Sequence, residues 1–239
     1  MATVFVTGGS RGIGLGIATK FLQAGYRVVI NCKEDAENMQ QVLASLQPLY
    51  GDHISGLVGD VSDYATAAAM ADKIGFIDVL INNAGQESFG LFTDMQEGEI
   101  FASIRANLYT AINMCHIVSP AMIRAKKGAI INISSIWGVT GASCEVIYST
   151  AKAGLIGLTK ALGKELAPSG VRVNAIACGA ISTRMNARLS PEEKMDFENQ
   201  IPMGRFGTVE EVGDLAVYLA SEKSSYLTGQ AITLDGGLI

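Results

Sequence analysis

The stretch Thr3-Val-Phe-Val-Thr7-Gly-Gly-Ser-Arg-Gly12-Ile-Gly14 begins as a β-rich run and continues as a glycine loop. The residues after it repeat apolar side chains at helical spacing: Ile13, Ile17, Phe21 and Leu22. A strand, a glycine loop and a helix in this order let the backbone approach a pyrophosphate, whose charge the helix N-terminus faces. The spacing Gly8-x-x-x-Gly12-x-Gly14 therefore predicts a dinucleotide site. The alternative is a turn with a purely structural role.

The rest of the chain alternates strand-like and helical patterns. Further strands are expected over 26–31, 54–58, 77–81, 129–133, 171–177 and 230–234. Helices are expected over 34–49 (ended by Pro48), 62–74, 148–166 and 208–219, and from a Thr93-x-x-Gln96 capping box to Met122. Because strands and helices alternate without a linker or repeat, we expect a single α/β domain over 1–239. The predicted fold is a Rossmann fold, a doubly wound seven-stranded parallel sheet with helices on both faces.

Residues 182–206 interrupt this alternation. Ser190-Pro-Glu-Glu193 is a capping box with proline at the first helical position. A short amphipathic helix with Met195 and Phe197 is expected to follow. We interpret the segment as a small helical lid over the substrate; a surface subdomain or an oligomer contact is the alternative.

Composition excludes several classes of protein. Hydrophobic residues make up 49% and charged residues 17%, which favours a folded core over disorder. The net charge of −5, without a run rich in lysine and arginine, argues against nucleic-acid binding. No apolar run approaches the ~18 residues of a membrane span, and a strand at the N-terminus leaves no room for a signal peptide. Four scattered cysteines indicate reduced thiols in a cytoplasmic protein, and two isolated histidines predict no metal site.

The end of the second strand bears on the choice of cofactor. A residue that reads the ribose 2′-hydroxyl would be acidic there, but the chain has Cys32 and Lys33. With Arg11, two cations stand where a 2′-phosphate would lie, which favours NADP(H) over NAD(H). The alternative is that both are solvated surface charges beside Glu34 and Asp35. Asp60, after the third strand, would contact an adenine edge or cap the helix over 62–74.

Tyr148-Ser-Thr-Ala-Lys152 is the strongest candidate for chemistry. On a helix, Tyr148 and Lys152 leave one face, one turn apart. An ammonium beside the phenol is expected to lower the tyrosine pKa and to prepare the pair for proton transfer; an ordinary exposed pair is the alternative. Asn82-Asn-Ala-Gly85 ends a strand where α/β sheets bind ligands. Asn107, within a helix, is either exposed or aimed at the site.

Taken in order, these motifs resemble the short-chain dehydrogenase/reductase family over nearly the whole chain. They are Thr7-Gly8-x-x-x-Gly12-x-Gly14, Asp60, Asn82-Asn83-Ala84-Gly85, Asn107, Ser135 and Tyr148-x-x-x-Lys152. Ser135 rather than Ser134 takes the catalytic position, because it lies thirteen residues before Tyr148. Ile201-Pro-Met-Gly-Arg-Phe-Gly207 and Leu227-Thr-Gly-Gln-x-x-x-x-Asp235-Gly-Gly237 are similar to bacterial 3-oxoacyl-[acyl-carrier-protein] reductases and to other bacterial members.

The resemblance implies NADPH-dependent reduction of a 3-oxoacyl thioester, carried by acyl carrier protein in fatty acid synthesis, by a homotetramer. It implies that Tyr148 donates a proton, Lys152 lowers the tyrosine pKa and binds the nicotinamide ribose, Ser135 binds the carbonyl oxygen, and Asn107 holds a water. The cofactor contacts it implies are Gly8, Ser10, Arg11, Gly12, Ile13, Gly14, Cys32, Lys33, Asp60, Val61, Asn83, Ala84, Gly85, Tyr148, Lys152, Gly179, Ile181 and Thr183.

Other functions stay open at this stage. A different ketone, such as acetoacetyl-CoA, a steroid or a sugar-derived carbonyl, is the second enzymatic hypothesis. A non-catalytic NADP(H)-binding sensor is the third, although the intact Ser135, Tyr148 and Lys152 argue against it. Two residues depart from the family pattern: Cys178 replaces a usual proline, and Ser169 replaces an arginine that helps dock the carrier protein. Basic residues at 124, 126 and 127 offer another docking surface.

Overall fold

The computed structural model describes residues 1–183 and 190–239, and its seven strands form one parallel sheet. The strands are β1 (Thr3–Val6), β2 (Arg27–Cys32), β3 (Ile54–Val58), β4 (Val79–Asn82), β5 (Gly128–Ser135), β6 (Val171–Cys178) and β7 (Ala231–Leu234). Their order is β3-β2-β1-β4-β5-β6-β7, which confirms the predicted doubly wound sheet. The order reverses between β1 and β4, the position where such sheets open a crevice for ligands.

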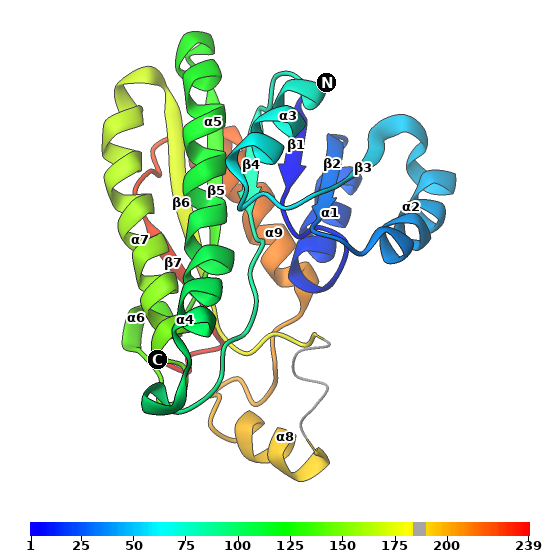
Figure 1. The fold of residues 1–239 in the computed structure, drawn as a ribbon. Helices are drawn as coiled ribbons and strands as arrows, with labels where there is room; N and C mark the ends of the chain where they lie inside the picture. Colours follow the sequence, from blue (N-terminus) through cyan, green and yellow to red (C-terminus); the bar gives the residue numbers. More distant parts are fainter. Residues whose placement is uncertain (184–189) are drawn as a thin grey trace.

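Helices cover both faces of the sheet (Figure 1). One layer consists of α1 (Gly12–Gln23), α2 (Ala36–Tyr50) and α9 (Val209–Ala220). The other contains α3 (Tyr64–Ile74), α5 (Thr110–Ala125) and α7 (Val146–Leu166). Because strand side chains alternate, Val4 and Val6 pack against the first layer while Phe5 packs against the second. Packing on both faces holds the carboxyl ends of the strands together at one edge of the sheet.

Three further helices lie near this edge. α4 (Glu97–Ile104) continues through a π-helical turn (Arg105–Tyr109) into α5. α6 (Trp137–Thr140) is a short helix between the predicted strand over 129–133 and the predicted helix over 148–166. α8 (Pro191–Glu198) lies below the carboxyl ends of the strands in Figure 1. No helix in the described ranges is both long and apolar enough to cross a membrane.

Three predicted helix boundaries are wrong. Pro48 does not end α2: it removes one N–H from the last turn, and the helix runs on to Tyr50. α4 begins with a capping box one turn later than expected, because Gln96 N–H donates to Glu99 Oε2 at 2.8 Å. α3 begins at Tyr64 rather than 62, and its cap is Asp63, not Asp60.

The predicted lid is described in part. Residues 184–189 lie outside the described residues, but the Ser190–Glu193 capping box is present and begins α8. Phe197 packs edge-on against Phe206, with ring centroids 5.4 Å apart. Met195 is 56% exposed, so α8 is less amphipathic than we predicted.

Candidate active site

A cleft of about 2100 Å³ opens at the carboxyl ends of the strands. A typical small-molecule pocket holds roughly 300–1,000 Å³, so this cleft has room for a dinucleotide and a second molecule beside it. The predicted catalytic residues that line it are Asn107, Ser135, Tyr148 and Lys152. The predicted cofactor residues that line it are Gly8, Ser10, Arg11, Gly12, Ile13, Cys32, Lys33, Asp60, Val61, Asn83, Ala84, Gly85, Tyr148, Lys152, Gly179, Ile181 and Thr183.

The glycine loop is held from behind by Asn83. The Asn83 side chain donates to the backbone oxygens of Thr7 (3.1 Å) and Gly8 (3.0 Å). A Cβ at Gly14 would come within 2.3 Å of the Gly8 oxygen and 2.5 Å of the Asn83 amide nitrogen. Gly14 therefore lets the loop pack against the start of α1, and its contact with a cofactor stays a prediction. The packed loop leaves the N-terminus of α1 open to the cleft, as a pyrophosphate requires.

The cations at the other end of the cleft have carboxylate partners. Arg11 Nη2 lies 2.5 Å from Asp35 Oδ2, and Lys33 Nζ lies 3.5 Å from Asp60 Oδ2. Asp60 also accepts a hydrogen bond from Ser62 N–H at 2.8 Å. The side chains of Arg11 and Lys33 are also more than half exposed, at 55% and 66%, as the alternative interpretation of surface charges beside acidic residues expects. They line the cleft where the sequence places a 2′-phosphate.

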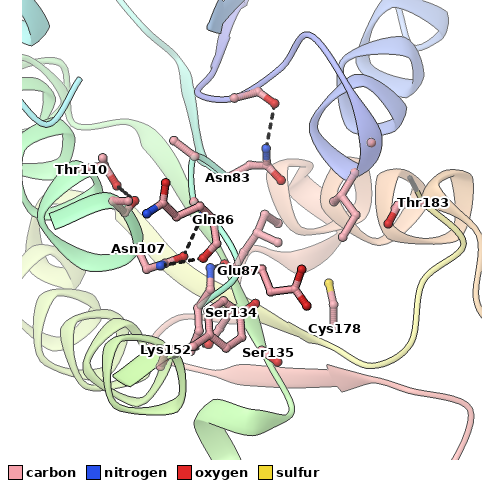
Figure 2. Close-up of a pocket in the computed structure, with 18 of the residues that line it drawn as sticks. Asn83, Gln86, Glu87, Asn107, Thr110, Ser134, Ser135, Lys152, Cys178 and Thr183 are labelled. Atoms are coloured by element: carbon pink, nitrogen blue, oxygen red, sulfur yellow. Dashed lines mark hydrogen bonds between the residues drawn. The ribbon is translucent and has the colours of Figure 1, made fainter. Parts of the chain in front are cut away.

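Ser135, Tyr148 and Lys152 come together at the end of β5 (Figure 2 labels Ser135 and Lys152). The Tyr148 hydroxyl and Ser135 are hydrogen-bonded. Lys152 is 5% exposed; its Nζ donates to Ile133 O at 2.9 Å and lies 5.5 Å from the centroid of the Tyr148 ring. Ser134 does not contact the Tyr148 hydroxyl in this way, because its own hydroxyl donates to the backbone oxygen of Lys152 at 2.9 Å. The geometry agrees with choosing Ser135 over Ser134.

Asn107 occupies the π-helical turn between α4 and α5 and is 1% exposed. Its Nδ2 donates to Gln86 O at 2.9 Å, and its Oδ1 accepts from Gln86 N–H at 3.1 Å (Figure 2). Nδ2 also donates to Ser103 O at 3.0 Å. A Cβ at Gly85 would meet Asn107 Oδ1 at 2.6 Å and Lys152 Nζ at 3.5 Å. Gly85 therefore lies between these two polar groups, and the amide is aimed at the site. π-turns of this kind often mark functional positions.

Burial dominates the electrostatics of the catalytic groups. Burial raises the pKa of Tyr148 above its ordinary value, and the carboxylates of Glu145 and Glu87 raise it further, against the hydrogen bond with Ser135. Burial also lowers the pKa of Lys152 to about 8. The expected lowering of the tyrosine pKa is wrong for this structure, because burial of the phenol disfavours the phenolate. Tyr148 is instead a protonated phenol at neutral pH, the form that donates a proton.

Several residues of the cleft were not predicted. Gln86, Glu87, Trp137 and Glu145 all line it, near the tyrosine. The pKa of Glu145 is raised by burial and by Glu87, and lowered by a hydrogen bond with Trp137. Two signals would have identified the carboxylates: Glu145 lies one helical turn before Tyr148, and Glu87 follows the Asn82–Gly85 motif almost directly.

Cys178 ends β6 and lines the cleft where a proline is usual in the family. It is 6% exposed, and burial raises its pKa to about 12 while Lys152 lowers it. The thiol is therefore neutral at physiological pH. Next to it, a Cβ at Gly179 would lie 2.6 Å from Asp235 Cβ, so this turn requires a glycine.

Comparison with known proteins agrees with this site. A family model described as Enoyl-(Acyl carrier protein) reductase matches residues 8–239. The chain is 42% identical over 238 residues to the 3-oxoacyl-[acyl-carrier-protein] reductase FabG of Chlamydia muridarum, covering 98% of this chain and 95% of that one. It is 37% identical over 236 residues to an uncharacterized oxidoreductase of Bacillus subtilis, covering 98% of each. The chain belongs to the short-chain dehydrogenase/reductase family.

Solved members of this family share the fold closely. The 3-oxoacyl-[acyl-carrier protein] reductase of Brucella melitensis superposes with a TM-score of 0.94 at 34% identity, covering 99% of this chain and 91% of that chain. A putative gluconate dehydrogenase of Agrobacterium tumefaciens superposes with a TM-score of 0.93 at 30% identity, covering 99% and 95%. The protein is thus an oxidoreductase that uses a nicotinamide cofactor.

The residues present fit such a cofactor. Gly12 has φ 51°, and the nearest atoms to a Cβ there would be those of Thr183 at 3.8 Å, so the backbone at the start of α1 is open to the cleft. The open helix N-terminus suits the pyrophosphate, and the Ser135–Tyr148–Lys152 group lies at the other end of the same cleft.

Proposed function

We propose that this reductase converts a 3-oxoacyl thioester, carried by acyl carrier protein in fatty acid synthesis, to the 3-hydroxyacyl product with NADPH. The observation that carries the proposal is the hydrogen-bonded pair of hydroxyls, Ser135 and Tyr148, above the buried Lys152. Two donors that converge on one point are suited to a carbonyl oxygen on which negative charge develops. NADPH, when bound, supplies the hydride for the carbonyl carbon.

Each side chain has a defined role in this proposal. Tyr148, protonated at neutral pH, donates its proton to the developing alkoxide. Ser135 donates a hydrogen bond to the same oxygen and keeps it in place. Lys152 binds the nicotinamide ribose and restores the proton of the tyrosine. Asn107 Oδ1, which accepts one hydrogen bond from Gln86, can accept a second from a water that leads to Lys152.

The thioester rests on the relatives named as 3-oxoacyl-[acyl-carrier-protein] reductases. The surface offers less support for the carrier protein. Arg124, Lys126 and Lys127 are exposed, but they precede β5 and so lie at the opposite edge of the sheet from the cleft. Lys127 also pairs with Asp78 at 2.7 Å. Ser169, at the same edge, adds no charge.

The deciding experiment compares acetoacetyl-carrier protein with acetoacetyl-CoA as substrates for steady-state NADPH oxidation. We expect a higher kcat/KM for the carrier-bound substrate. Equal or better use of CoA would contradict a role in carrier-bound synthesis.

A second candidate substrate is a ketone that bears hydroxyl groups, such as a sugar-derived carbonyl. Glu87, Glu145 and Gln86 line the cleft near Tyr148, and their oxygens accept hydrogen bonds from hydroxyls. The structural similarity to a putative gluconate dehydrogenase points the same way. Turnover of a sugar-derived ketone in the absence of thioester turnover would favour this candidate.

We further propose that residues 1–239 act as one domain whose segment 182–206 closes over the substrate. We propose that the protein is a homotetramer in the cytoplasm. Both proposals rest on the family. The mass of the protein in solution by light scattering tests the tetramer, and a dimer or a monomer would contradict it.

A further inference from the structure

Two ion pairs occupy the end of the cleft where the adenosine ribose would lie. Arg11 pairs with Asp35 at 2.5 Å, and Lys33 pairs with Asp60 at 3.5 Å. All four residues line the cleft. Each cation that a 2′-phosphate would use already has a carboxylate partner from the chain itself.

The two oxygens of Asp35 have separate tasks. Oδ1 accepts the backbone N–H of Asn38 at 3.1 Å and caps α2, whereas Oδ2 accepts from Arg11. The Asn38 side chain in turn donates to Ser10 O at 2.9 Å, which ties this cap to the glycine loop. The cap therefore holds the carboxylate beside Arg11.

We propose that Asp35 is a specificity residue: its carboxylate takes, on Arg11, the position of a cofactor 2′-phosphate and thereby lowers selectivity for NADPH over NADH. The proposal rests on the proposed function, because it assumes a nicotinamide cofactor whose 2′-phosphate would lie beside Arg11. Guanidinium groups bind carboxylate and phosphate in the same bidentate manner, so the two anions compete for one partner.

The local charge supports this competition. Arg11 and Lys33 are balanced by Asp35 and Asp60, and Glu34 adds a further negative charge to the lining. A phosphate that brings a charge of about −1.5 to −2 must displace one carboxylate and remain beside it. The 2′-hydroxyl of NADH brings no charge, so NADH binds without displacing a carboxylate and without charge repulsion from it.

The expected effect is moderate because these groups face solvent. The side chains of Arg11 and Asp35 are 55% and 39% exposed. Exposed pairs are screened by water and salt, so removal of the carboxylate should change affinity by about threefold to tenfold rather than by orders of magnitude.

The test is calorimetric binding of NADP⁺ and NAD⁺ to the full-length protein and to Asp35→Asn. Asparagine caps helices as well as aspartate does, so this variant keeps the cap and removes only the charge. We expect the affinity for NADP⁺ to rise about threefold to tenfold at low salt and the ratio of NADP⁺ to NAD⁺ affinity to rise with it. An unchanged or lower ratio would overturn the proposal.

Asp63→Asn is the matched control. Asp63 is an exposed carboxylate that caps α3 in the same way, with Thr66 N–H donating to it at 2.9 Å. The Asp63→Asn variant should leave the ratio of NADP⁺ to NAD⁺ affinity unchanged. A rise in this ratio equal to that of Asp35→Asn would show a general charge effect and overturn the role of Asp35. Because the binding measurement uses no ketone, its result does not depend on whether the proposed substrate is correct. If the wild-type protein bound neither nucleotide, the proposal of an NADP(H) cofactor would be contradicted as well.

Discussion

The two ends of the cleft hold their charged groups in opposite ways. At the catalytic end, Lys152 is 5% exposed and donates to a backbone oxygen, and burial sets the pKa of both Lys152 and Tyr148. At the adenosine end, the side chains of Arg11 and Lys33 are 55% and 66% exposed, and carboxylates pair with them. A change at the buried end should therefore affect the chemical step strongly. A change at the exposed end should affect cofactor affinity modestly and in a salt-dependent manner.

The largest expected effect is at Tyr148. Tyr148→Phe removes the proton donor and keeps the ring, so kcat should fall by about 10²–10⁴ while NADPH binding changes little. Steady-state turnover and calorimetric binding measure the two quantities separately. Near-normal turnover would show that another group donates the proton.

A second large effect should come from the titration of Lys152. Burial lowers its pKa to about 8, so the ammonium is present below this pH and is lost as the pH rises through it. We expect kcat/KM for NADPH, which reports on the free enzyme, to fall as the pH rises through about 8. Lys152→Arg, which stays charged, should not show this fall. A flat wild-type profile to higher pH would contradict the assignment.

Loss of the Asn107 amide should destabilise the fold as well as the site. Asn107→Ala leaves Gln86 O, Gln86 N–H and Ser103 O without this partner near a buried turn. We expect a loss of roughly 1–3 kcal/mol in the free energy of unfolding, measured with denaturant. Asn113→Ala, in the same layer with an amide bonded to Val61 O and Ser62 O, is a control that should lose stability but keep the turnover of the folded fraction.

The smallest effect should come from Glu145. Its carboxylate raises the pKa of Tyr148, so Glu145→Gln should lower that pKa. Alcohol oxidation, the reverse reaction, requires the tyrosinate, and its rising alkaline limb should move to lower pH. Glu87→Gln should shift the limb in the same direction by less. A shift to higher pH in either variant would contradict the electrostatic account.

Much of the fold could be predicted from sequence because its signals are local. The patterns correctly place the strand, glycine loop and helix of residues 3–24, the capping box at Ser190 and the helix that follows Thr208. The errors arise where two local signals compete. Asp60 and Asp63 both precede α3, and it is Asp63 that accepts the backbone N–H of Thr66. Pro48 lacks the N–H of a regular helical hydrogen bond and so predicts a helix end, but α2 runs on to Tyr50.

The site was less predictable because its properties depend on burial. The spacing of Tyr148 and Lys152 correctly predicted that they lie together. It did not predict that both are buried, and burial reverses the expected shift of the Tyr148 pKa. Cations at positions 11 and 33 were visible in the sequence. Asp35 was visible beside them as well, whereas the pairing of Lys33 with Asp60 became evident only when the fold brought the two residues to the same edge.

The most direct test of ketone reduction compares two four-carbon thioesters, acetoacetyl and crotonyl, with the wild-type protein and NADPH. The first offers a C=O bond, and the second offers the C=C bond that an enoyl reductase would use. Ser135 and Tyr148 converge on an oxygen, so we expect NADPH oxidation with acetoacetyl thioester only, giving one 3-hydroxyacyl product for each NADPH consumed. Oxidation with crotonyl thioester, or with neither substrate, would contradict the account.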